Sequence, residues 1–329
     1  MSTQKLLIVP QNWLGDVVMS QTLLKKIKSN NSDVSIDILI NSSYKDLVER
    51  MPEINKALLL DCNHKELGIL KRYRLAKKIR GSYNQSIILS RSIKSALIPY
   101  FAKIPIRTGE LGELRYILIN DLKYFSNEDR RKTAHRYISM FSDKKEELDE
   151  KYYPSLKPDH ENIKNLTEKY NLNTSKKIVI FAPGAAYGPS KMWPVEKFKE
   201  LGEKLNKNYF IIILGSLDEK NIGDKIITHK DMINLCGKTS ITDAVDLMHI
   251  SKFCVSNDSG LMHLASATNT KSISIYGATS PDLTPPLTTN KEIHYKQISC
   301  SPCFEKKCKY GHYNCLSEIQ VNDVFKSFK

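Results

Sequence analysis

Short apolar runs alternate with longer amphipathic segments through the first part of the chain. The apolar runs predict buried strands at 6–9, 34–40, 57–60, 86–90 and 104–106. The segments that follow them repeat apolar residues at helical spacing, which predicts helices at about 16–28, 44–51, 65–80 and 95–101. Residues 107–109 look like the end of a strand and a turn. Strands and helices in this alternating order are typical of a parallel sheet covered on both faces.

The alternation stops at residues 142–176 and then starts again. This connecting stretch has a charge run, several prolines and one predicted helix at about 161–170. Beyond it, strands are predicted at 177–182, 210–214, 232–235, 253–256 and 272–276. Helices are predicted at 195–205, 218–227, 241–251, 261–267 and 318–328. We therefore predict two Rossmann-like, doubly wound α/β domains, 1–158 and 159–329, facing each other across a cleft. The pattern leaves open whether the terminal helix packs back on the first domain.

The composition is that of an ordinary globular protein. Hydrophobic residues make up 41% and charged residues 26% of 329 positions, which excludes a disordered chain, a collagen-like fibre and a small disulfide scaffold. No stretch approaches the length of a membrane-spanning helix. The first apolar run is too short for the core of a secretory signal, so we expect a cytoplasmic protein.

The net charge of +14 narrows the choice of partners. The excess is spread over both halves, but one predicted helix collects six basic residues without an acidic one, namely Lys71, Arg72, Arg74, Lys77, Lys78 and Arg80. Such a helix is either an ordinary solvated face or a contact for an anionic partner. The candidates are a nucleic acid, an acidic membrane surface and a phosphorylated substrate.

Four of the seven cysteines lie close together near the C-terminus. Cys62, Cys236 and Cys254 are isolated, and we expect them to pack as small apolar residues. The other four have the spacing C-x2-C-x4-C-x6-C with His312 inside, at Cys300, Cys303, Cys308 and Cys315. In a cytosolic protein this pattern favours a metal over disulfides. A structural zinc site and reduced thiols in a packed loop both remain open.

Asp16 is the first candidate for chemistry. It comes where the first predicted strand gives way to a helix, so its carboxylate lies at the positive end of a helix dipole. Aspartate there can simply cap the helix. It can also act as a general base for a hydroxyl held close to it.

Two turns in the second half are candidates for binding an anion. The first runs from Asn257 to His263, where a strand ends and a helix begins, and it offers Asp258, Ser259, Gly260 and His263. The second is a small-residue loop after the strand at 177–182, and it carries Gly184 and Lys191. Neither has the spacing of a P-loop, and no G-x-G-x-x-G follows the first strand. Plain helix capping and a packed histidine would also explain the first turn.

Basic residues also follow several predicted strand ends in the first half. They are Arg91, Lys94, Arg107, Arg115 and Arg136. Together they could form a wall that binds an anion and faces the Asp16 loop. Each of them taken singly could be ordinary surface charge.

Five segments, in this order, resemble the lipopolysaccharide heptosyltransferases of glycosyltransferase family 9. They are Trp13-Leu14-Gly15-Asp16 with Met19-Ser20-Gln21, Arg107-Thr108-Gly109 with Gly112-Glu113-Leu114-Arg115-Tyr116, Pro183-Gly184-Ala185 with Lys191 and Trp193-Pro194, Asn257-Asp258-Ser259-Gly260-Leu261-Met262-His263, and Tyr276-Gly277 with Ser280-Pro281-Asp282 and Thr284-Pro285-Pro286. Any one segment is weak evidence, but the ordered set spans nearly the whole chain. The stretch from Cys300 to Cys315 looks like a version found in part of the family.

The resemblance implies a GT-B fold with an acceptor-binding N-terminal domain and a donor-binding C-terminal domain. It implies inverting transfer of L-glycero-D-manno-heptose from ADP-heptose to the first heptose of the lipopolysaccharide inner core. Asp16 would be the catalytic base. Lys191, Ser259 and Gly260 would hold the pyrophosphate beside the Gly184 loop, and Asp258 and His263 would orient the donor.

The resemblance also implies where the enzyme works. The acceptor is a phosphorylated glycolipid at the cytoplasmic face of the inner membrane, so peripheral attachment to that anionic surface is expected. No metal cofactor is expected for catalysis, in keeping with the lack of any Asp-x-Asp pair in the sequence.

Three alternatives stay open beside this hypothesis. A sister heptosyltransferase would use another acceptor, and a nucleotide-sugar epimerase of the same architecture would need no acceptor. A non-enzymatic nucleic-acid-binding protein would account for the charge. No DNA- or RNA-reading module is recognised in the sequence, so we predict that nucleic acid is not a partner.

Overall fold

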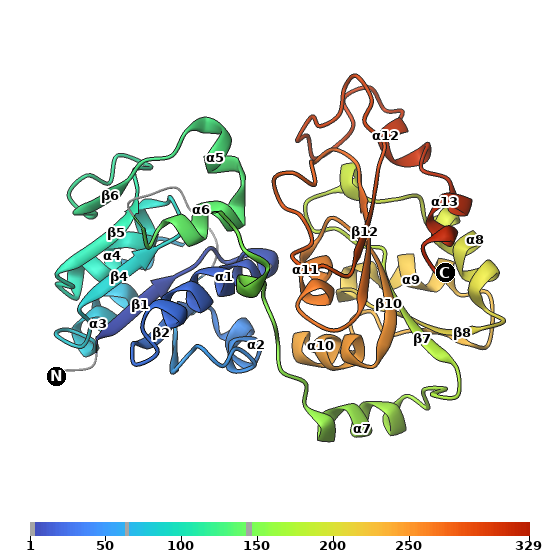
Figure 1. Ribbon diagram of the computed structural model, residues 1–329, viewed down its shortest axis with the longest axis horizontal. Coiled ribbons are helices and arrows are strands. Elements are labelled where there is room, and N and C mark those ends of the chain that lie inside the picture. The colour runs from blue at the N-terminus through green and yellow to red at the C-terminus, as the bar shows by residue number, and fades with distance from the viewer. Residues whose placement is uncertain (1–3, 63–65, 143–146) are drawn as a thin grey trace. The chain divides into compact units, whose positions relative to one another are not determined.

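The apolar runs form two parallel sheets, one in each half of the chain (Figure 1). The computed structural model describes residues 4–62, 66–142 and 147–329. The chain divides into two compact units, Met1–Tyr153 and Pro154–Lys329, a few residues before the boundary predicted at 158 and 159. Two parallel-sheet α/β domains were predicted, and this prediction is confirmed.

The first domain has the strand order β3-β2-β1-β4-β5-β6 in its described residues. Its strands are β1 (Lys5–Val9), β2 (Ser35–Ile40), β3 (Lys56–Leu59), β4 (Gln85–Ile88), β5 (Ile106–Glu110) and β6 (Asp121–Lys123). Its helices are α1 (Leu14–Asn30), α2 (Lys45–Glu49), α3 (Ile69–Lys78), α4 (Ile93–Phe101), α5 (Asn127–Arg131) and α6 (Thr133–Ser139). The short 3₁₀ turns η1 (Ser42–Tyr44) and η2 (Glu150–Tyr152) complete it.

The second domain repeats the same order, β9-β8-β7-β10-β11-β12. Its strands are β7 (Lys177–Ala182), β8 (Tyr209–Ile213), β9 (Met232–Asn234), β10 (Ser251–Asn257), β11 (Lys271–Tyr276) and β12 (Lys291–Tyr295). Its helices are α7 (His160–Lys169), α8 (Val195–Leu205), α9 (Lys220–Ile226), α10 (Ile241–His249), α11 (Gly260–Ser266), α12 (Asn314–Ser317) and α13 (Val321–Lys326). The 3₁₀ turns are η3 (Pro189–Lys191) and η4 (Leu217–Glu219).

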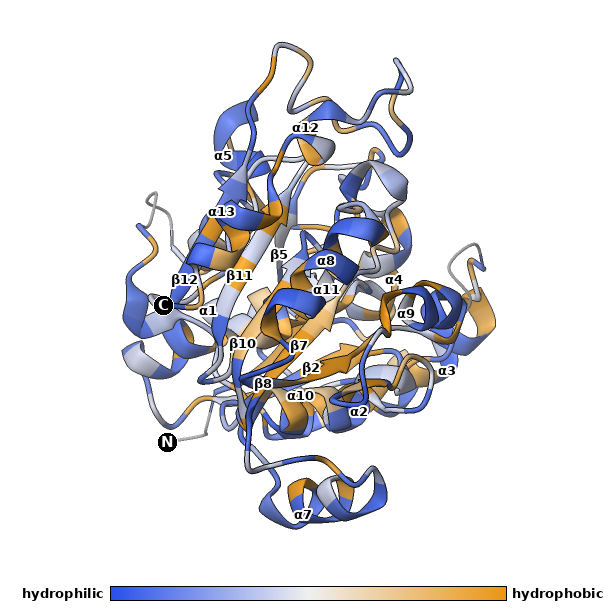
Figure 2. Cartoon of the chain, turned by 90° about the vertical axis from the view of Figure 1, so that its right-hand side faces the viewer, coloured by the Kyte–Doolittle hydropathy of each residue, from blue (hydrophilic) through white to orange (hydrophobic). Residues whose placement is uncertain are grey.

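Burial on both faces explains why the central strands have unbroken apolar sequences. Leu6, Leu7 and Ile8 of β1 are fully buried, and so are Val179, Ile180 and Phe181 of β7. A strand covered by helices on both sides has no solvent face, so its sequence does not alternate. Figure 2 shows β7 coloured hydrophobic along most of its length, whereas α7 is largely hydrophilic.

The strand order fixes where ligands can bind in each domain. In the first sheet, β2 and β3 are added on one side of β1, and β4, β5 and β6 are then added on its other side. The second sheet does the same around β7. The crevice where the direction reverses lies at the carboxyl ends of β1 and β4 in the first domain, and of β7 and β10 in the second. The predicted site residues Asp16, Lys191 and Asp258 follow such strand ends.

Several elements differ from the sequence-based predictions. Residues 107–109 were predicted as a strand end and turn, but they lie inside β5, where Thr108 and Gly109 pair with β4 on one side and β6 on the other. The helix predicted at 65–80 begins only at Ile69, after Gly68 in a left-handed conformation, and residue 65 lies outside the described residues. The terminal helix, α13, packs against α8 of its own domain, with Val324 fully buried. Among the described residues, no helix is both long and apolar enough to cross a membrane.

The aromatic core of the second domain gives a test of this packing. The ring of Phe198 on α8 is fully buried, with its centroid 5.5 Å from that of Phe181 and 5.1 Å from that of Trp193. We expect Phe198→Ala to lower the free energy of unfolding of this domain by about 3–5 kcal/mol, because it leaves a cavity. Urea unfolding should be followed by the fluorescence of Trp193 in a Trp13→Phe background, which removes the other tryptophan.

A matched control lies on the same helix. Lys199 is exposed, so Lys199→Ala should leave the transition nearly unchanged. Equal transitions for Phe198→Ala and Lys199→Ala would contradict the described core.

Candidate active site

Three turns meet at the carboxyl edge of the second sheet, after the neighbouring strands β7, β10 and β11. Lys191 ends the turn after β7, Asp258 follows β10 directly, and Thr279 follows β11. Lys191 Nζ lies 2.6 Å from Asp258 Oδ2, and the Thr279 hydroxyl donates to the same oxygen at 2.6 Å. This edge of a doubly wound sheet is where ligands bind, so the cluster is the candidate site of this domain.

The Lys191–Asp258 pair is mostly withdrawn from water. The Asp258 side chain is 4% exposed and that of Lys191 is 14% exposed. The Lys191 ammonium also lies 4.9 Å from the centre of the Tyr187 ring, a cation–π contact. An ammonium has three donors, so Asp258 can fix its position while another N–H binds an anionic ligand. The sequence predicted Lys191 and Asp258, but it gave no reason to select Thr279 or Tyr187.

The side chain of Asn257 holds the two turns together. Its amide donates to the carbonyl of Pro183 at 2.6 Å, and its carbonyl oxygen accepts from the Trp193 backbone N–H at 3.0 Å. Both ends of the loop that carries Lys191 are therefore bound to the last residue of β10. Because Asn257 is fully buried, these bonds are shielded from competition by water.

The other residues that the sequence predicted for this site lie on the same turns and on α11. Ser259 is the N-cap residue of α11 and Gly260 is its first residue. Gly184 follows β7, and a Cβ built on it would come within 1.7 Å of the Glu219 carboxylate. His263 is buried on α11, and burial lowers its pKa to about 4. Its imidazole is therefore neutral at physiological pH and adds no positive charge to the site.

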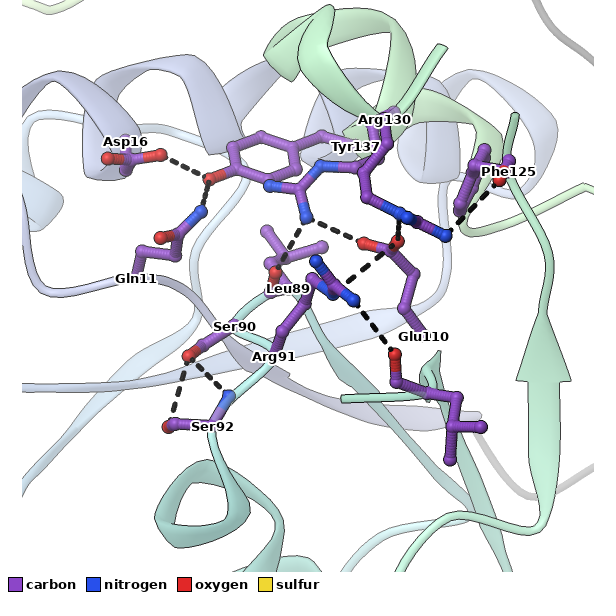
Figure 3. A network of polar contacts seen from close by, with 12 residues as sticks. Gln11, Asp16, Leu89, Ser90, Arg91, Ser92, Glu110, Phe125, Arg130 and Tyr137 are labelled. Carbon is purple, nitrogen blue, oxygen red and sulfur yellow. Dashed lines mark hydrogen bonds and ion pairs between the residues drawn. The ribbon is translucent and has the colours of Figure 1, made fainter. Parts of the chain in front are cut away.

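Asp16 lies in the first turn of α1, in the first domain (Figure 3). The simple capping role is wrong, because the N-cap residue is Trp13. The Tyr137 hydroxyl donates to Asp16 Oδ1 at 2.5 Å, and Gln11 Nε2 donates to that hydroxyl at 3.1 Å. Burial and the negative charge of Asp16 raise the pKa of Tyr137, so the phenol keeps its proton as a donor. Tyr137 is a site residue that no signal in the sequence indicated.

A pocket of about 180 Å³ opens beside the Asp16 loop. It is lined by residues that follow β1, β2, β3 and β4, among them Gln11, Trp13, Arg72, Ser90 and Lys94. Arg72 is held by the carbonyls of Leu67 and Lys94, at 2.8 and 3.0 Å. The pocket thus lies at the carboxyl ends of β1 and β4, where the strand order of the first sheet reverses. The predicted residue Lys94 is one of its lining residues.

Three guanidinium groups converge on one buried carboxylate, that of Glu110 (Figure 3). Arg136, Arg130 and Arg91 lie 2.7, 3.0 and 3.9 Å from its oxygens, and the Glu110 side chain is only 2% exposed. The carboxylate neutralises one of the three charges. The structure therefore brings together the predicted Arg91 and Arg136, and it adds Arg130, which the sequence did not single out.

The two other predicted arginines are engaged elsewhere. Arg115 is 1% exposed and donates to the carbonyls of Glu110 and Ser92, and burial lowers its pKa to about 10. Arg107 donates to the carbonyls of Ile104 and Leu118, at 2.7 and 2.8 Å. The five predicted basic residues thus do not form one continuous wall, because these two bind the backbone of their own domain.

The four clustered cysteines line a second pocket, of about 250 Å³, in the second domain. All four are free thiols, and His312 also lines the pocket. Among the described residues, no three His, Cys, Asp or Glu side chains lie close enough together to hold one metal ion. A structural zinc site at these four cysteines and reduced thiols in a packed loop were both left open by the sequence, and the zinc site stays a prediction.

Comparison with known proteins identifies the family of this chain. Residues 72–314 match the model of glycosyltransferase family 9 (heptosyltransferase). The chain is 36% identical to the lipooligosaccharide heptosyltransferase 2 of Haemophilus influenzae, over 88% of this chain and 87% of that protein. It is 34% identical to the lipopolysaccharide heptosyltransferase 2 of Escherichia coli, over 86% and 85%.

The chain belongs to glycosyltransferase family 9. The solved structure of the E. coli ADP-heptose lps heptosyltransferase II superposes with a TM-score of 0.86 at 30% identity, covering 99% of this chain and 97% of that one. The family match spans all the donor-side residues and Tyr137 but begins after Asp16. This glycosyltransferase therefore carries the predicted family fold, and its predicted enzyme class is confirmed.

The buried histidine of this family 9 enzyme leads to a pH prediction. His263 has a pKa near 4 in the folded domain, below the ordinary 6.5. As the pH falls from about 6.5 towards 4, the unfolded chain takes up a proton that the folded domain does not bind, so stability should fall over that range. The imidazole NMR signals of His263 should stay constant from pH 8 to pH 5.

Those signals can be assigned by their loss in a His263→Gln variant. A titration of the His263 ring with a midpoint near 6.5 would show that it is solvated, against the structure.

Proposed function

We propose that this enzyme transfers L-glycero-D-manno-heptose from ADP-heptose to the first heptose of the lipopolysaccharide inner core. The named relatives at 34–36% identity are heptosyltransferases 2, and their names supply the donor sugar and the class of acceptor. The observation that carries the proposal is the Lys191–Asp258–Thr279 cluster at the carboxyl edge of the second sheet. It offers one oriented positive charge where a nucleotide diphosphate would lie.

The second domain binds the donor in this proposal. Lys191 contacts the pyrophosphate, and the backbone N–H groups at Ser259 and Gly260 add uncharged donors. Asp258 keeps the Lys191 ammonium in place and, with the Gly184 loop, bounds the space for the nucleotide. His263 lies on α11, directly after the turn that carries Asp258 and Ser259. Because its imidazole is neutral, it orients the donor through packing and hydrogen bonding rather than through charge.

The first domain supplies the base. Asp16 accepts the proton of an acceptor hydroxyl while that oxygen attacks the anomeric carbon of the heptose. The bond from that carbon to the phosphate oxygen breaks, and ADP leaves with the bonding electrons. One displacement inverts the configuration. Asp16 lies in the first turn of α1, near the positive end of the helix dipole, and the Tyr137 hydroxyl donates to its carboxylate and orients it.

Charge on the leaving ADP is balanced by Lys191 rather than by a divalent cation in this proposal. A fixed ammonium aimed at the pyrophosphate stabilises negative charge as it develops. The sequence has no Asp-x-Asp pair, the usual carboxylate clamp for a metal-bound nucleotide sugar. Catalysis should therefore persist in the presence of a chelator.

The acceptor carries phosphate, and the first domain offers cations for it. Arg91 and Arg130 keep their guanidinium groups partly exposed beside Glu110, and Lys94 lines the pocket next to the Asp16 loop. Arg136 is buried and holds Glu110, so it positions the other two. We place Arg107 and Arg115 in supporting roles for the same reason.

The excess positive charge also fits an acceptor embedded in an anionic membrane. The net charge of the chain is +14, and the exposed basic residues of α3 are part of this excess. Each basic residue near an acidic bilayer contributes about 1 kcal/mol of attraction. We propose that the enzyme works at the cytoplasmic face of the inner membrane as a peripheral protein.

A transfer assay with defined substrates tests the proposed function. ADP-heptose should be consumed only with an acceptor that carries the first heptose, and UDP-sugars should not replace it. Consumption of the nucleotide sugar without any acceptor would instead favour an epimerase. Transfer to an acceptor that lacks the first heptose would identify a sister heptosyltransferase.

Asp16→Asn tests the base. The amide can still accept the Tyr137 hydrogen bond but cannot take a proton, so turnover should fall by about 10²–10⁴-fold while ADP-heptose affinity is retained. Asp46→Asn is the matched control, because Asp46 is an exposed carboxylate in the first turn of α2. Near-normal turnover of Asp16→Asn would remove Asp16 from the mechanism.

A further inference from the structure

A long loop joins β12 to α12 in the second domain (Figure 1). It spans residues 296–313 without a helix or a strand. An ordered loop of this length inside a compact domain usually serves a function. Its segment 301–306 is bonded to two turns of the candidate site, and these bonds indicate what the loop does.

Ser190 is the residue at which the loop meets the turn after β7. It is only 2% exposed. Its backbone N–H donates to the Lys306 carbonyl at 3.3 Å, and its hydroxyl donates to the Glu305 carbonyl. Its own carbonyl accepts from the Ala278 N–H at 3.1 Å. All three polar groups of the residue before Lys191 are therefore bound.

The same loop segment also binds the turn after β11. The Phe304 N–H donates to the Ala278 carbonyl at 2.8 Å, and the Ser301 hydroxyl donates to the Gly277 carbonyl at 2.7 Å. This turn supplies Thr279 to the candidate site. The loop therefore bonds to two of the three turns that form that site.

Gly188 allows the loop to lie backbone against backbone on the turn that carries Lys191. Its φ is +144°, a conformation that residues with a side chain rarely adopt. A Cβ at this position would lie 2.5 Å from the Lys306 carbonyl oxygen. Any larger residue would therefore push the loop away from the turn.

Tyr187 connects the loop to the side chain of Lys191 itself. The Tyr187 hydroxyl donates to the Phe304 carbonyl, and the Lys191 Nζ lies 4.9 Å from the centre of the half-buried ring. The face of an aromatic ring attracts a cation, and the attraction grows as water is removed. The Tyr187 ring and the Asp258 carboxylate thus restrain the same ammonium from separate turns.

We infer that segment 301–306 supports the turn that carries Lys191, and that Tyr187 and Ser190 are the positioning residues through which it acts. This inference rests on the proposed function, in which the Lys191 ammonium binds the pyrophosphate of the donor. A mobile lysine side chain loses conformational entropy when it binds a ligand. A side chain that is already held in place loses less, so the support raises the affinity for a diphosphate without contacting it.

ADP binding to the full chain, measured by isothermal titration calorimetry, tests this inference. Tyr187→Leu should weaken ADP binding by about 5–20-fold, because the ring contact with Lys191 is lost. Tyr187→Phe keeps the ring and should weaken it by less than about 3-fold. Ser190→Ala should weaken it by about 2–10-fold. Adenosine has no pyrophosphate, so its affinity should be the same in all these variants.

A double-mutant cycle with Lys191→Met separates positioning from a general loss of structure. In the Lys191→Met background, Tyr187→Leu should weaken ADP binding little further, because no ammonium is left to position. Tyr310→Leu is the matched control, since Tyr310 is an exposed tyrosine of the same loop outside segment 301–306. It should bind ADP like the parent, and circular dichroism checks that each variant folds.

Three results would overturn the inference and leave the proposed donor site intact. They are parental ADP affinity in both Tyr187→Leu and Ser190→Ala, equal losses of ADP and adenosine affinity, and losses that add to that of Lys191→Met. Parental ADP affinity in Lys191→Met itself would instead overturn the donor assignment in the proposed function, and the inference with it.

Discussion

The candidate site of the second domain depends on one buried amide, that of Asn257. Asn257 ends the strand β10, and its side chain bonds to the loop after β7 at both Pro183 and Trp193. In an open parallel sheet the crevice between these two strands is formed by chain reversal alone, and nothing in the sheet itself fixes the loops above it. The Asn257 bonds supply that restraint, so Lys191 meets Asp258 at 2.6 Å rather than moving freely in solvent.

In the first domain, three arginines lie close enough together to repel one another, and the carboxylate of Glu110 offsets this repulsion. Glu110 lies at the end of β5 with a fully buried carboxylate, and three arginines approach it from α5, α6 and the turn after β4. A buried carboxylate with such partners holds the guanidinium groups in fixed positions, and removal of either partner would leave an uncompensated charge. One buried acid therefore holds these three cationic side chains in place.

The sequence predicted the parts of the fold that follow from continuous local patterns. The strand 177–182 and the helix 195–205 match β7 and α8, because apolar residues there are either unbroken or at regular helical spacing. It missed β6 and β12, whose residues are all half-buried and so have no apolar run. Residues 107–109 were misread because a buried Thr–Gly pair inside β5 has the composition of a turn.

The residues of the candidate site also differ in whether a local sequence pattern indicates them. Asp16, Lys191 and Asp258 follow strand ends, which is a local signal in the sequence. Tyr137 lies 121 positions from Asp16 and Thr279 lies 21 positions from Asp258, and only the folded sheet brings them into contact. Arg115 was predicted to face an anion, yet tertiary packing buries it against backbone carbonyls. Sequence alone indicates which residues carry charge, but not which way they point.

The bond between Tyr137 and Asp16 has a consequence for how the enzyme matures during synthesis. The ribosome releases β1 and α1 first, whereas α6 emerges only after every strand of the first sheet. A nascent chain that stops short of α6 could complete this sheet and still leave the Asp16 carboxylate without its phenol donor. Asp16 would thus acquire its hydrogen-bond donor late in the assembly of its domain, before the second domain has been translated.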